Sequence, residues 1–210
     1  MTIRLHRGDL PNLSAYKGAV AIDTETMGLD PHRDRLCVVQ LSPGDGSADV
    51  VQIAAGQTRA PNIERLLADT SVLKLFHYGR FDIGMLAKAF GVLAQPVYCT
   101  KIASRLARTY TDKHGLKDLA REILGVDLSK QQQLSDWGAD SLTDAQVSYA
   151  ATDVLYLHAL REKLDAMLAR EGRNELAAAC FRFLPERSRL DLAGWAGEDI
   201  FSHSPPKKDG

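Results

Sequence analysis

Three short apolar segments near the N-terminus constrain the possible folds more than any other feature. They cover residues 19–22, 36–41 and 48–53. Turn residues separate them, with Gly28 and Asp30-Pro31 in the first gap and a Pro-Gly-Asp-Gly sequence at residues 43–46 in the second. Apolar runs of this length between turn signals predict strands, and gaps this short favour antiparallel neighbours. The sheet is therefore predicted to begin with antiparallel strands.

The rest of the sequence adds helices and a further strand. Its pattern predicts a helix over 63–68, a strand over 72–76 and a helix over 82–90 ended by Gly91, which form a crossover back onto the sheet. Later helices are predicted over residues 100–109, 116–124, 144 to about 170, with Thr143 as its cap, and 175–183. We therefore predict a single α/β domain over residues 1–210. Its mixed central β-sheet, antiparallel at the start and then parallel, is flanked by α-helices and followed by a disordered tail from about residue 205.

Composition excludes some classes of protein. The hydrophobic fraction of 45% and charged fraction of 25% match an ordinary globular protein, and no apolar run is long enough to span a membrane. The net charge of −1 argues against a protein that coats long nucleic acid through clustered basic residues. No signal-peptide core occurs in the first ten residues, so we expect a cytoplasmic protein. Cys37, Cys99 and Cys180 form no CxxC pair and are predicted to be buried thiols.

Asp23 and Glu25 follow the first apolar segment directly. Side chains two residues apart on a strand point to the same face, so both carboxylates are predicted to project from one side of the sheet. Two carboxylates on one face repel each other unless a cation lies between them. Taken alone, the pair fits a solvated strand end or a helix cap as well as it fits a metal site.

Two further acidic positions are ambiguous when each is considered alone. Asp82 follows Phe81 and opens a predicted helix, where an acidic residue commonly acts as the N-cap. Tyr149 and Asp153 lie four residues apart within a predicted helix, so they face the same way. An isolated pair of this kind is usually a simple hydrogen bond. Neither position therefore indicates a function without the other motifs.

Together, these positions resemble the three motifs of the DEDDy exonuclease superfamily. The motifs are D-x-E at residues 23–25, an aromatic residue followed by Asp at 81–82, and Y-x-x-x-D at 149–153. The similarity is to the ribonuclease D-like branch, which has the ribonuclease H-like fold. It implies a 3′-to-5′ exonuclease that hydrolyses phosphodiesters and releases nucleoside 5′-monophosphates from RNA. It also implies two divalent metal ions, Mg²⁺ or Mn²⁺, as cofactors.

The same resemblance gives each motif residue a role. Phosphodiester hydrolysis places charge on an attacking water and on a leaving 3′ oxygen, and two metal ions about 4 Å apart stabilise both. Hard cations of this kind take oxygen ligands. By resemblance, Asp23, Glu25 and Asp153 hold one ion, Asp23 also bridges to the second, and Asp82 contributes through a water-bound contact. Tyr149 is the general-base partner that orients the attacking water.

Further segments narrow the resemblance to the nanoRNase C family of ribonuclease D relatives. They are TMGLDP at residues 26–31, RLCVVQL at 35–41 and KQQQLSDW at 130–137. The resemblance implies a cytoplasmic enzyme that cleaves dinucleotides at the end of RNA decay, including the linear products of cyclic-dinucleotide breakdown. It also implies a homo-oligomer of eight subunits and no accessory helical domains.

Candidate substrate-binding residues come partly from this resemblance. Leu29 matches a leucine that wedges between the last two bases, although leucine is also commonly buried in a core. Lys101, Arg105 and Arg108 form a basic stripe at helical spacing, suited to a phosphate or to simple solvation. The full set of candidates is Thr26, Met27, Gly28, Leu29, His77, Tyr78, Arg80, Phe81, Lys101, Arg105, Arg108, Lys130 and Gln133. Trp137 and Trp195 are predicted to be packing anchors rather than base platforms.

Two alternatives remain open from the sequence. The first is a broader exonuclease that acts on longer RNA or on DNA, as ribonuclease D and proofreading domains do. The second is an inactive nucleic-acid-binding scaffold on the same fold, which the presence of all four carboxylates and Tyr149 disfavours.

Overall fold

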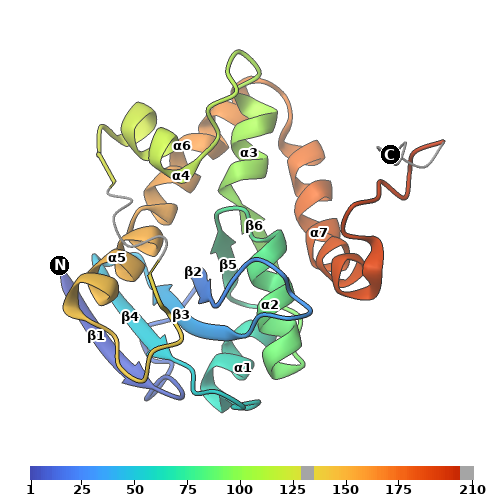
Figure 1. Ribbon diagram of the computed structural model, residues 1–210. Coiled ribbons are helices and arrows are strands. Elements are labelled where there is room, and N and C mark those ends of the chain that lie inside the picture. The colour runs from blue at the N-terminus through green and yellow to red at the C-terminus, as the bar shows by residue number, and fades with distance from the viewer. Residues whose placement is uncertain (129–134, 204–210) are drawn as a thin grey trace.

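The computed structural model describes residues 1–128 and 135–203, and these residues form a six-stranded mixed sheet with helices on both faces (Figure 1). The strands are β1 (Thr2–Arg7), β2 (Ala19–Thr26), β3 (Leu36–Ser42), β4 (Ser47–Gln52), β5 (Leu73–Phe76) and β6 (Val97–Cys99). Their order across the sheet is β1-β4-β3-β2-β5-β6. β2 and β4 each pair antiparallel with β3, whereas β5 pairs parallel with both β2 and β6. The predicted mixed sheet is therefore confirmed.

Two strands were not predicted. β1 pairs parallel with β4 at one edge of the sheet, and the three-residue β6 forms the other edge. Both lack the apolar run that marks a central strand: β1 has the sequence TIRLHR, and β6 is too short to show a period. Because β1 and β6 lie at the two edges of the sheet, they do not change the arrangement of the central strands, which carry the predicted site.

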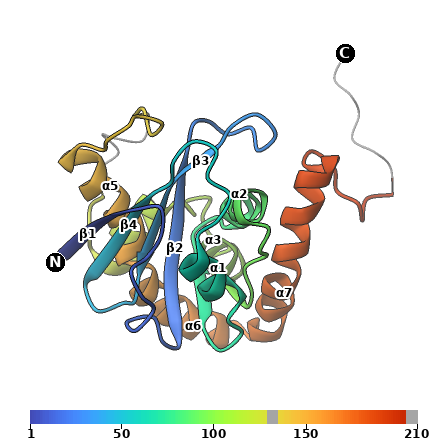
Figure 2. The same ribbon diagram turned by 90° about the horizontal axis from the view of Figure 1, so that it is seen from below.

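The helices cover the two faces of the sheet. α1 (Pro61–Ala68), α2 (Arg80–Phe90) and part of α7 (Asn174–Leu190) pack on one face. The other face carries α3 (Thr100–Ala107), α4 (Leu116–Leu119), α5 (Asp144–Leu155) and α6 (Leu157–Arg170). α4 continues into a π-helical turn at Ala120–Leu124, and α7 into another at Asp191–Trp195. Figure 2 shows α7 beside α2, on the side of the molecule away from β1. Within the described ranges, no helix combines the length and apolar character needed to cross a membrane.

Helix boundaries differ from the predictions at two places. The predicted helix over 144–170 is broken at Tyr156 into α5 and α6, although its N-terminus has the expected cap, with Thr143 and Gln146 forming a capping box. The last helix does not end before Pro185 but continues to Leu190. Leu184 is buried in the core next to α2, and this packing outweighs the preference of the residue before proline for extended backbone.

Alternation along β2 sets the direction of the site residues. Val20 and Ile22 pack in the cluster that contains α1 and α2, whereas Ala21 packs in the cluster that contains α5 and α6. Thr24 therefore faces α2, and Asp23 and Glu25 face α5. The register of β2 against β3 shifts between Glu25 and Thr26, which marks a bulge at the end of the strand.

A buried carboxylate joins β1 to the rest of the sheet. Asp49 on β4 accepts hydrogen bonds from Arg4 Nε (2.7 Å), His6 Nε2 (2.7 Å) and the Tyr16 hydroxyl (2.5 Å). Burial raises the pKa of Asp49, but these hydrogen bonds outweigh it and lower the pKa to about 2. Because the folded-state pKa is depressed, this stabilisation is present above about pH 4 and is lost as the pH falls toward 2.

We expect Asp49→Asn to destabilise the protein by about 3 kcal/mol, because it weakens three hydrogen bonds to a buried carboxylate, each worth about 1 kcal/mol or more when charge-assisted. For a domain of this size, the corresponding fall in Tm is about 10 °C. Thermal unfolding at neutral pH measures it. Glu171→Gln, which breaks an exposed ion pair with Arg170, is the matched control and should leave Tm unchanged. An Asp49→Asn Tm equal to that of wild type would contradict this account of β1.

Candidate metal centre and substrate pocket

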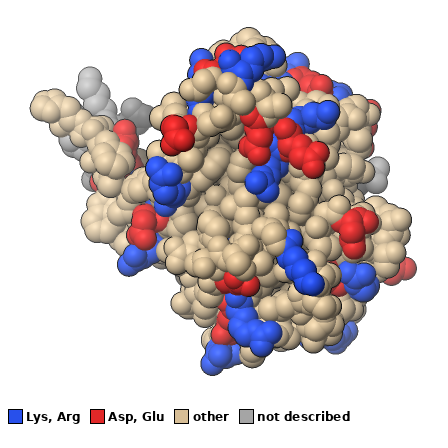
Figure 3. All heavy atoms as spheres, turned by 180° about the vertical axis from the view of Figure 1, so that it is seen from behind, with Lys and Arg blue, Asp and Glu red and all other residues tan. Residues whose placement is uncertain are grey.

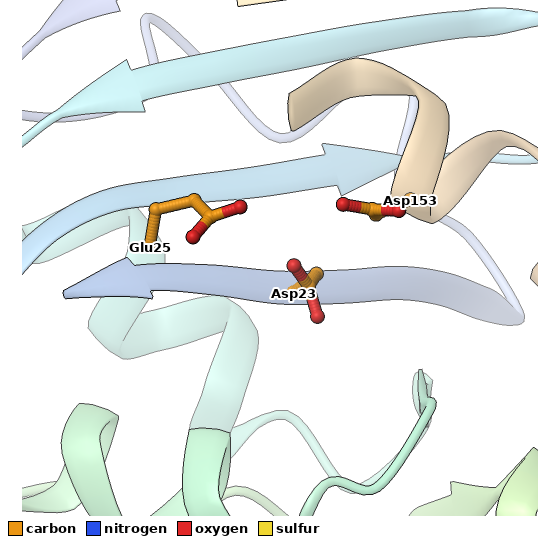
Figure 4. Close-up of side chains that lie close together, drawn as sticks. All are labelled: Asp23, Glu25 and Asp153. Atoms are coloured by element: carbon orange, nitrogen blue, oxygen red, sulfur yellow. The ribbon is translucent and has the colours of Figure 1, made fainter. Parts of the chain in front are cut away.

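Three predicted site residues meet at the end of β2. Asp23 and Glu25 project from β2 toward Asp153 on α5, and their carboxyl groups face one another (Figure 4). One carboxylate oxygen from each residue lies within 4.8 Å of the others. Residues 128 or more positions apart in the sequence thus form one acidic group, as the motifs predicted.

Asp82 reaches the same site from the other face of the sheet. It lies in the first turn of α2, is 5% exposed, and accepts a hydrogen bond of 2.6 Å from the Thr24 hydroxyl. Thr24 lies between Asp23 and Glu25 on β2, so this bond fixes the fourth carboxylate next to the other three. α2 begins at Arg80, with Gly79 preceding it, so Asp82 is not the N-cap that its position alone suggested.

The four carboxylates are crowded without a compensating positive charge. Burial raises the pKa of Glu25 to about 8, with further increases from Asp153 and Asp82. Burial likewise raises the pKa of Asp82 and of Asp153 to about 7, and holds that of Asp23 well above its ordinary value. None of the ion pairs between Lys, Arg or His and acidic residues in the described ranges involves these four.

This arrangement fits a divalent cation. A bound cation removes the repulsion, and an all-oxygen ligand set suits the hard ions Mg²⁺ and Mn²⁺. Gln40 donates a hydrogen bond of 3.3 Å to Asp23 Oδ2, which orients that carboxylate. The site therefore has both the charge and the ligand chemistry of a metal centre.

Tyr149 lies one helical turn before Asp153 on α5. Burial, followed by the charges of Asp153, Glu25 and Asp23, raises the pKa of its phenol above the ordinary value. The phenol therefore stays protonated at neutral pH. Its ring lies 6.2 Å from that of Trp137, which is 3% exposed and confirms the prediction of a packing anchor. Trp195 is instead 43% exposed, so the same prediction is wrong for that residue.

A pocket of about 530 Å³ opens beside the carboxylates. Its walls come from β2 and the loop after it, from the start of α2 and from the end of the chain. They are formed by Asp23, Thr24, Glu25, Thr26, Leu29, Pro31, His77, Tyr78, Arg80, Phe81, Asp82, Gly84, Ser188, Asp191, Leu192 and Ala196. Its size suits a small ligand rather than a folded macromolecule. The wall residues after position 187 were not identified from the sequence, because no motif marks them.

The loop after β2 presents Leu29 to solvent at this pocket. Leu29 is 84% exposed, which excludes its interpretation as a core residue. Met27 and Gly28 do not line the pocket but form the turn before Leu29, with the Thr26 hydroxyl donating to the Gly28 carbonyl at 2.5 Å. A Cβ added to Gly28 would lie 2.2 Å from Asp34 Oδ2, so glycine is needed for this close approach.

His77 is a neutral hydrogen-bonding residue of the pocket. The Thr100 hydroxyl donates to the Phe76 carbonyl at 3.2 Å, so it accepts from His77 Nδ1 at 2.8 Å and leaves Nε2 unprotonated. Burial, with a further contribution from Lys101, lowers the pKa of His77 to about 3. His77 can therefore accept a hydrogen bond from a hydroxyl group but carries no charge for a phosphate.

The predicted basic stripe is only partly present. Lys101 contacts a residue of the pocket wall, with its Nζ 4.3 Å from the ring centre of Tyr78, and Arg105 is exposed further along α3. The prediction is wrong for Arg108, which is 2% exposed because it pairs with Glu122 and donates to the Lys113 carbonyl at 2.9 Å. Lys130 and Gln133 lie outside the described residues.

The surface charges agree with the low net charge. On the face seen in Figure 3, basic and acidic side chains are interspersed, and no continuous basic band crosses it. This face therefore offers no extended site for the backbone of a long nucleic acid.

Comparison with known proteins identifies the class. Residues 9–169 match the family of 3′-5′ exonucleases, a range that contains all four carboxylates and Tyr149. The ribonuclease D of Granulibacter bethesdensis is 38% identical over 154 residues, which cover 73% of this chain and 38% of that protein. The chain belongs to the 3′-5′ exonuclease family, and its mixed sheet has the ribonuclease H-like fold of that family.

Solved structures confirm the narrower resemblance to nanoRNase C. Brucella melitensis NrnC with bound Mg²⁺ is 63% identical, with a TM-score of 0.94 over 97% of this chain and 100% of that one. Brucella melitensis NrnC bound to pGG is 64% identical, with a TM-score of 0.95 over the same shares. The chain spans less than half the length of the ribonuclease D relative, so it shares only part of that protein.

Proposed function

We propose that this protein is a divalent-metal-dependent 3′-to-5′ exoribonuclease that completes the degradation of short RNA, above all dinucleotides. The observation that carries this proposal is the convergence of Asp23, Glu25 and Asp153, with Asp82 beside them, at one end of a pocket of about 530 Å³. This constellation suits phosphodiester hydrolysis with two cations. Membership in the 3′-5′ exonuclease family supports the same activity.

Each carboxylate has a distinct task in this proposal. Asp23, Glu25 and Asp153 would hold one divalent ion, Asp23 would also be a ligand of the second, and Asp82 would contribute through a water molecule. When bound, Mg²⁺ or Mn²⁺ would supply the positive charge that stabilises the attacking water and the leaving 3′ oxygen. Thr24 and Gln40 keep Asp82 and Asp23 oriented through their hydrogen bonds.

Tyr149 orients the attacking water. Its raised pKa keeps the phenol protonated at neutral pH, so it holds the water by a hydrogen bond rather than removing its proton. Trp137 supports the ring from one side. In this role Tyr149 would be a catalytic residue, because its phenol would contact the reacting water.

The pocket supports the preference for short substrates. In this proposal Leu29, which is exposed at the pocket, separates the two bases of a dinucleotide, and the neutral His77 accepts a hydrogen bond from a ribose hydroxyl. The Brucella NrnC structure with pGG supports a similar ligand here. We infer that the enzyme acts in the cytoplasm, on linear products of cyclic-dinucleotide turnover as well as on RNA fragments. We also infer that it assembles as a homo-oligomer of eight subunits, as the resemblance to nanoRNase C implies.

We expect Leu29→Ala to raise KM for a dinucleotide about tenfold, because an exposed apolar side chain that separates two bases contributes about 1 to 2 kcal/mol of contact. Steady-state kinetics on pGG with the 5′ end labelled measures this effect. Met27→Ala is the control, since Met27 is exposed on the same loop but does not line the pocket. Equal KM values for wild type and Leu29→Ala would show that Leu29 does not separate the two bases.

We expect the apparent affinity for Mn²⁺ to rise with pH between about 6 and 8. The folded, metal-free site holds protons because the pKa values of Glu25, Asp82 and Asp153 are raised to about 7 or 8. Cation binding must displace these protons, so their competition weakens as the pH rises. Calorimetric titrations at pH 6 and pH 8 test this sign, and an affinity independent of pH would contradict it.

A product time course tests the substrate proposal. Wild-type enzyme is given equal concentrations of a dinucleotide, a ten-nucleotide RNA and a DNA duplex, all 5′-labelled, with Mg²⁺ or Mn²⁺. The proposal predicts fastest turnover of the dinucleotide. Equal rates on all three would favour a broader exonuclease, a candidate that the similarity to ribonuclease D supports.

A further inference from the structure

The end of the described chain forms one wall of the substrate pocket. We call residues 188–203 the C-terminal arm. Ser188, Asp191, Leu192 and Ala196 of this arm line the same pocket as Asp23 and Glu25. The arm lies beyond residues 9–169, the range that matches the exonuclease family. The residues that form this wall therefore lie outside the range that the family model matches.

One carboxylate holds two guanidinium groups at the base of the arm. Asp191 Oδ1 accepts from Arg80 Nη2 at 2.6 Å and from Arg187 Nη2 at 2.8 Å, while Asp191 Oδ2 pairs with Arg80 Nε. The side chain of Asp191 is 14% exposed, that of Arg187 16% and that of Arg80 32%. Charge-assisted hydrogen bonds of this bidentate kind are stronger than neutral ones. Asp191 is thus the link between the arm and α2.

The two arginines also fix the backbone of the arm. Gly194 has φ of 106°, and this turn directs the carbonyl groups that follow it back toward the arginines. Arg80 donates to the Ala196 carbonyl at 2.7 Å, and Arg187 donates to the Trp195 carbonyl at 2.5 Å. These bonds tie the backbone around Trp195 and Ala196 to α2 and α7. The position of the pocket wall therefore depends on where the arginines are held.

The same contacts connect the wall to the acidic site. Arg80 lies two residues before Asp82 at the start of α2, and Ser188 Oγ donates to the Arg80 carbonyl at 2.8 Å. Leu192 of the arm packs close to Gly84, which lies on α2 as Arg80 does. Arg80 was a candidate for substrate contact, but its guanidinium is already bonded to Asp191 and to the Ala196 carbonyl. Its observed role is to hold the arm.

We propose that the C-terminal arm, held by Asp191 between Arg80 and Arg187, sets the upper length limit of the RNA substrate. This inference rests on the proposed function. An RNA strand that extends past the pocket on this side has to displace the arm and break the hydrogen bonds of Asp191. A dinucleotide fits beside the wall and breaks none of them. Asp191 is a positioning residue, because it acts through the arm rather than on the reacting atoms.

The test compares kcat/KM for a dinucleotide with that for a ten-nucleotide RNA. Asp191→Asn should shift the ratio about tenfold toward the longer RNA, the factor that corresponds to one charge-assisted hydrogen bond of about 1.4 kcal/mol. Asp191→Glu, which keeps the charge, should retain most of the wild-type selectivity. Glu186→Gln is the matched control, because it breaks an exposed ion pair with Arg189 on the same helix. An unchanged ratio in Asp191→Asn overturns the proposal.

A second variant covers the case in which Asp191→Asn fails to fold. Leu192→Ala removes part of the wall and keeps the ion pairs, and it should shift the ratio in the same direction. An unchanged ratio in a folded Leu192→Ala protein overturns the proposal as well. Failure of the proposed function looks different, since wild-type enzyme would then cleave neither RNA. Equal wild-type rates on both RNAs would leave the exonuclease activity intact but would overturn the proposal, because the arm would then have no length limit to set.

Discussion

Replacing Asp23 with Asn is expected to reduce hydrolysis of a dinucleotide by at least about a thousandfold. Asp23 is the proposed contact to both cations, and stabilisation of transition-state charge by bound metal is worth several kcal/mol. A loss of ~4 kcal/mol corresponds to this factor in rate. Single-turnover kinetics at saturating Mn²⁺ measures the effect on the chemical step. Asp112→Asn, which changes an exposed carboxylate away from the pocket, should keep wild-type activity.

The Tm of the metal-free protein shows whether the Asp23→Asn variant is folded. Because the pKa values of the site carboxylates lie above their ordinary range, the folded protein holds protons that the unfolded chain releases between about pH 4 and pH 8. Its stability therefore falls as the pH rises through this interval. Asp23→Asn removes one of the repelling charges, so at pH 8 without metal its Tm should exceed that of wild type. Retained hydrolysis, or a lower Tm, would contradict the role of Asp23.

Tyr149→Phe is expected to lower kcat about a hundredfold and to leave KM nearly unchanged. The substitution removes only the hydroxyl that orients the attacking water, and positioned groups of this kind contribute factors of about 10² to 10⁴. The ring keeps its contact with Trp137, so the fold should be unaffected. Steady-state kinetics with a dinucleotide measures both constants.

Tyr110→Phe is the matched control for the tyrosine, because Tyr110 is 73% exposed and does not line the pocket. It should have wild-type kcat and KM. A Tyr149→Phe enzyme with wild-type kcat would show that the hydroxyl is not needed for the reaction. A rise in KM without a change in kcat would assign Tyr149 to substrate binding instead.

The central sheet could be predicted because its strands carry their own signals. β2, β3 and β4 are buried apolar runs between glycine and proline turns, and their short connections left antiparallel pairing as the favoured arrangement. β1 could not be predicted, because arginine and histidine alternate with its apolar residues, and their shared partner, Asp49, lies on a different strand. The break at Tyr156 has no proline or glycine to mark it.

The acidic site was predictable for a different reason. Strand and helix periods fix which side chains share a face, so the spacing of Asp23 to Glu25 and of Tyr149 to Asp153 contains geometric information. Arg108 followed the same helical spacing as Lys101, yet it is buried because of Glu122, which lies fourteen residues away on a different segment. Local spacing cannot report a contact of that kind.

The pocket wall shows most clearly which features cannot be predicted from the sequence. Asp191 meets Arg80 across 111 residues, and neither residue belongs to a motif that names the other as its partner. Only the packing of α7 against α2 brings them together. The proposed determinant of substrate length is thus set by tertiary contacts, whereas the carboxylate motifs are visible in the sequence.

Stripping the protein of metal and titrating Mn²⁺ back while recording nucleotide release tests the metal-centred mechanism most directly. The account predicts no release of nucleoside 5′-monophosphate from a dinucleotide in the presence of a chelator, with the fold retained by circular dichroism. Activity should return as Mn²⁺ is added, and it should not return in Asp23→Asn. Hydrolysis that persists in the chelator, or metal-replete wild-type protein that leaves every oligonucleotide intact, would contradict it.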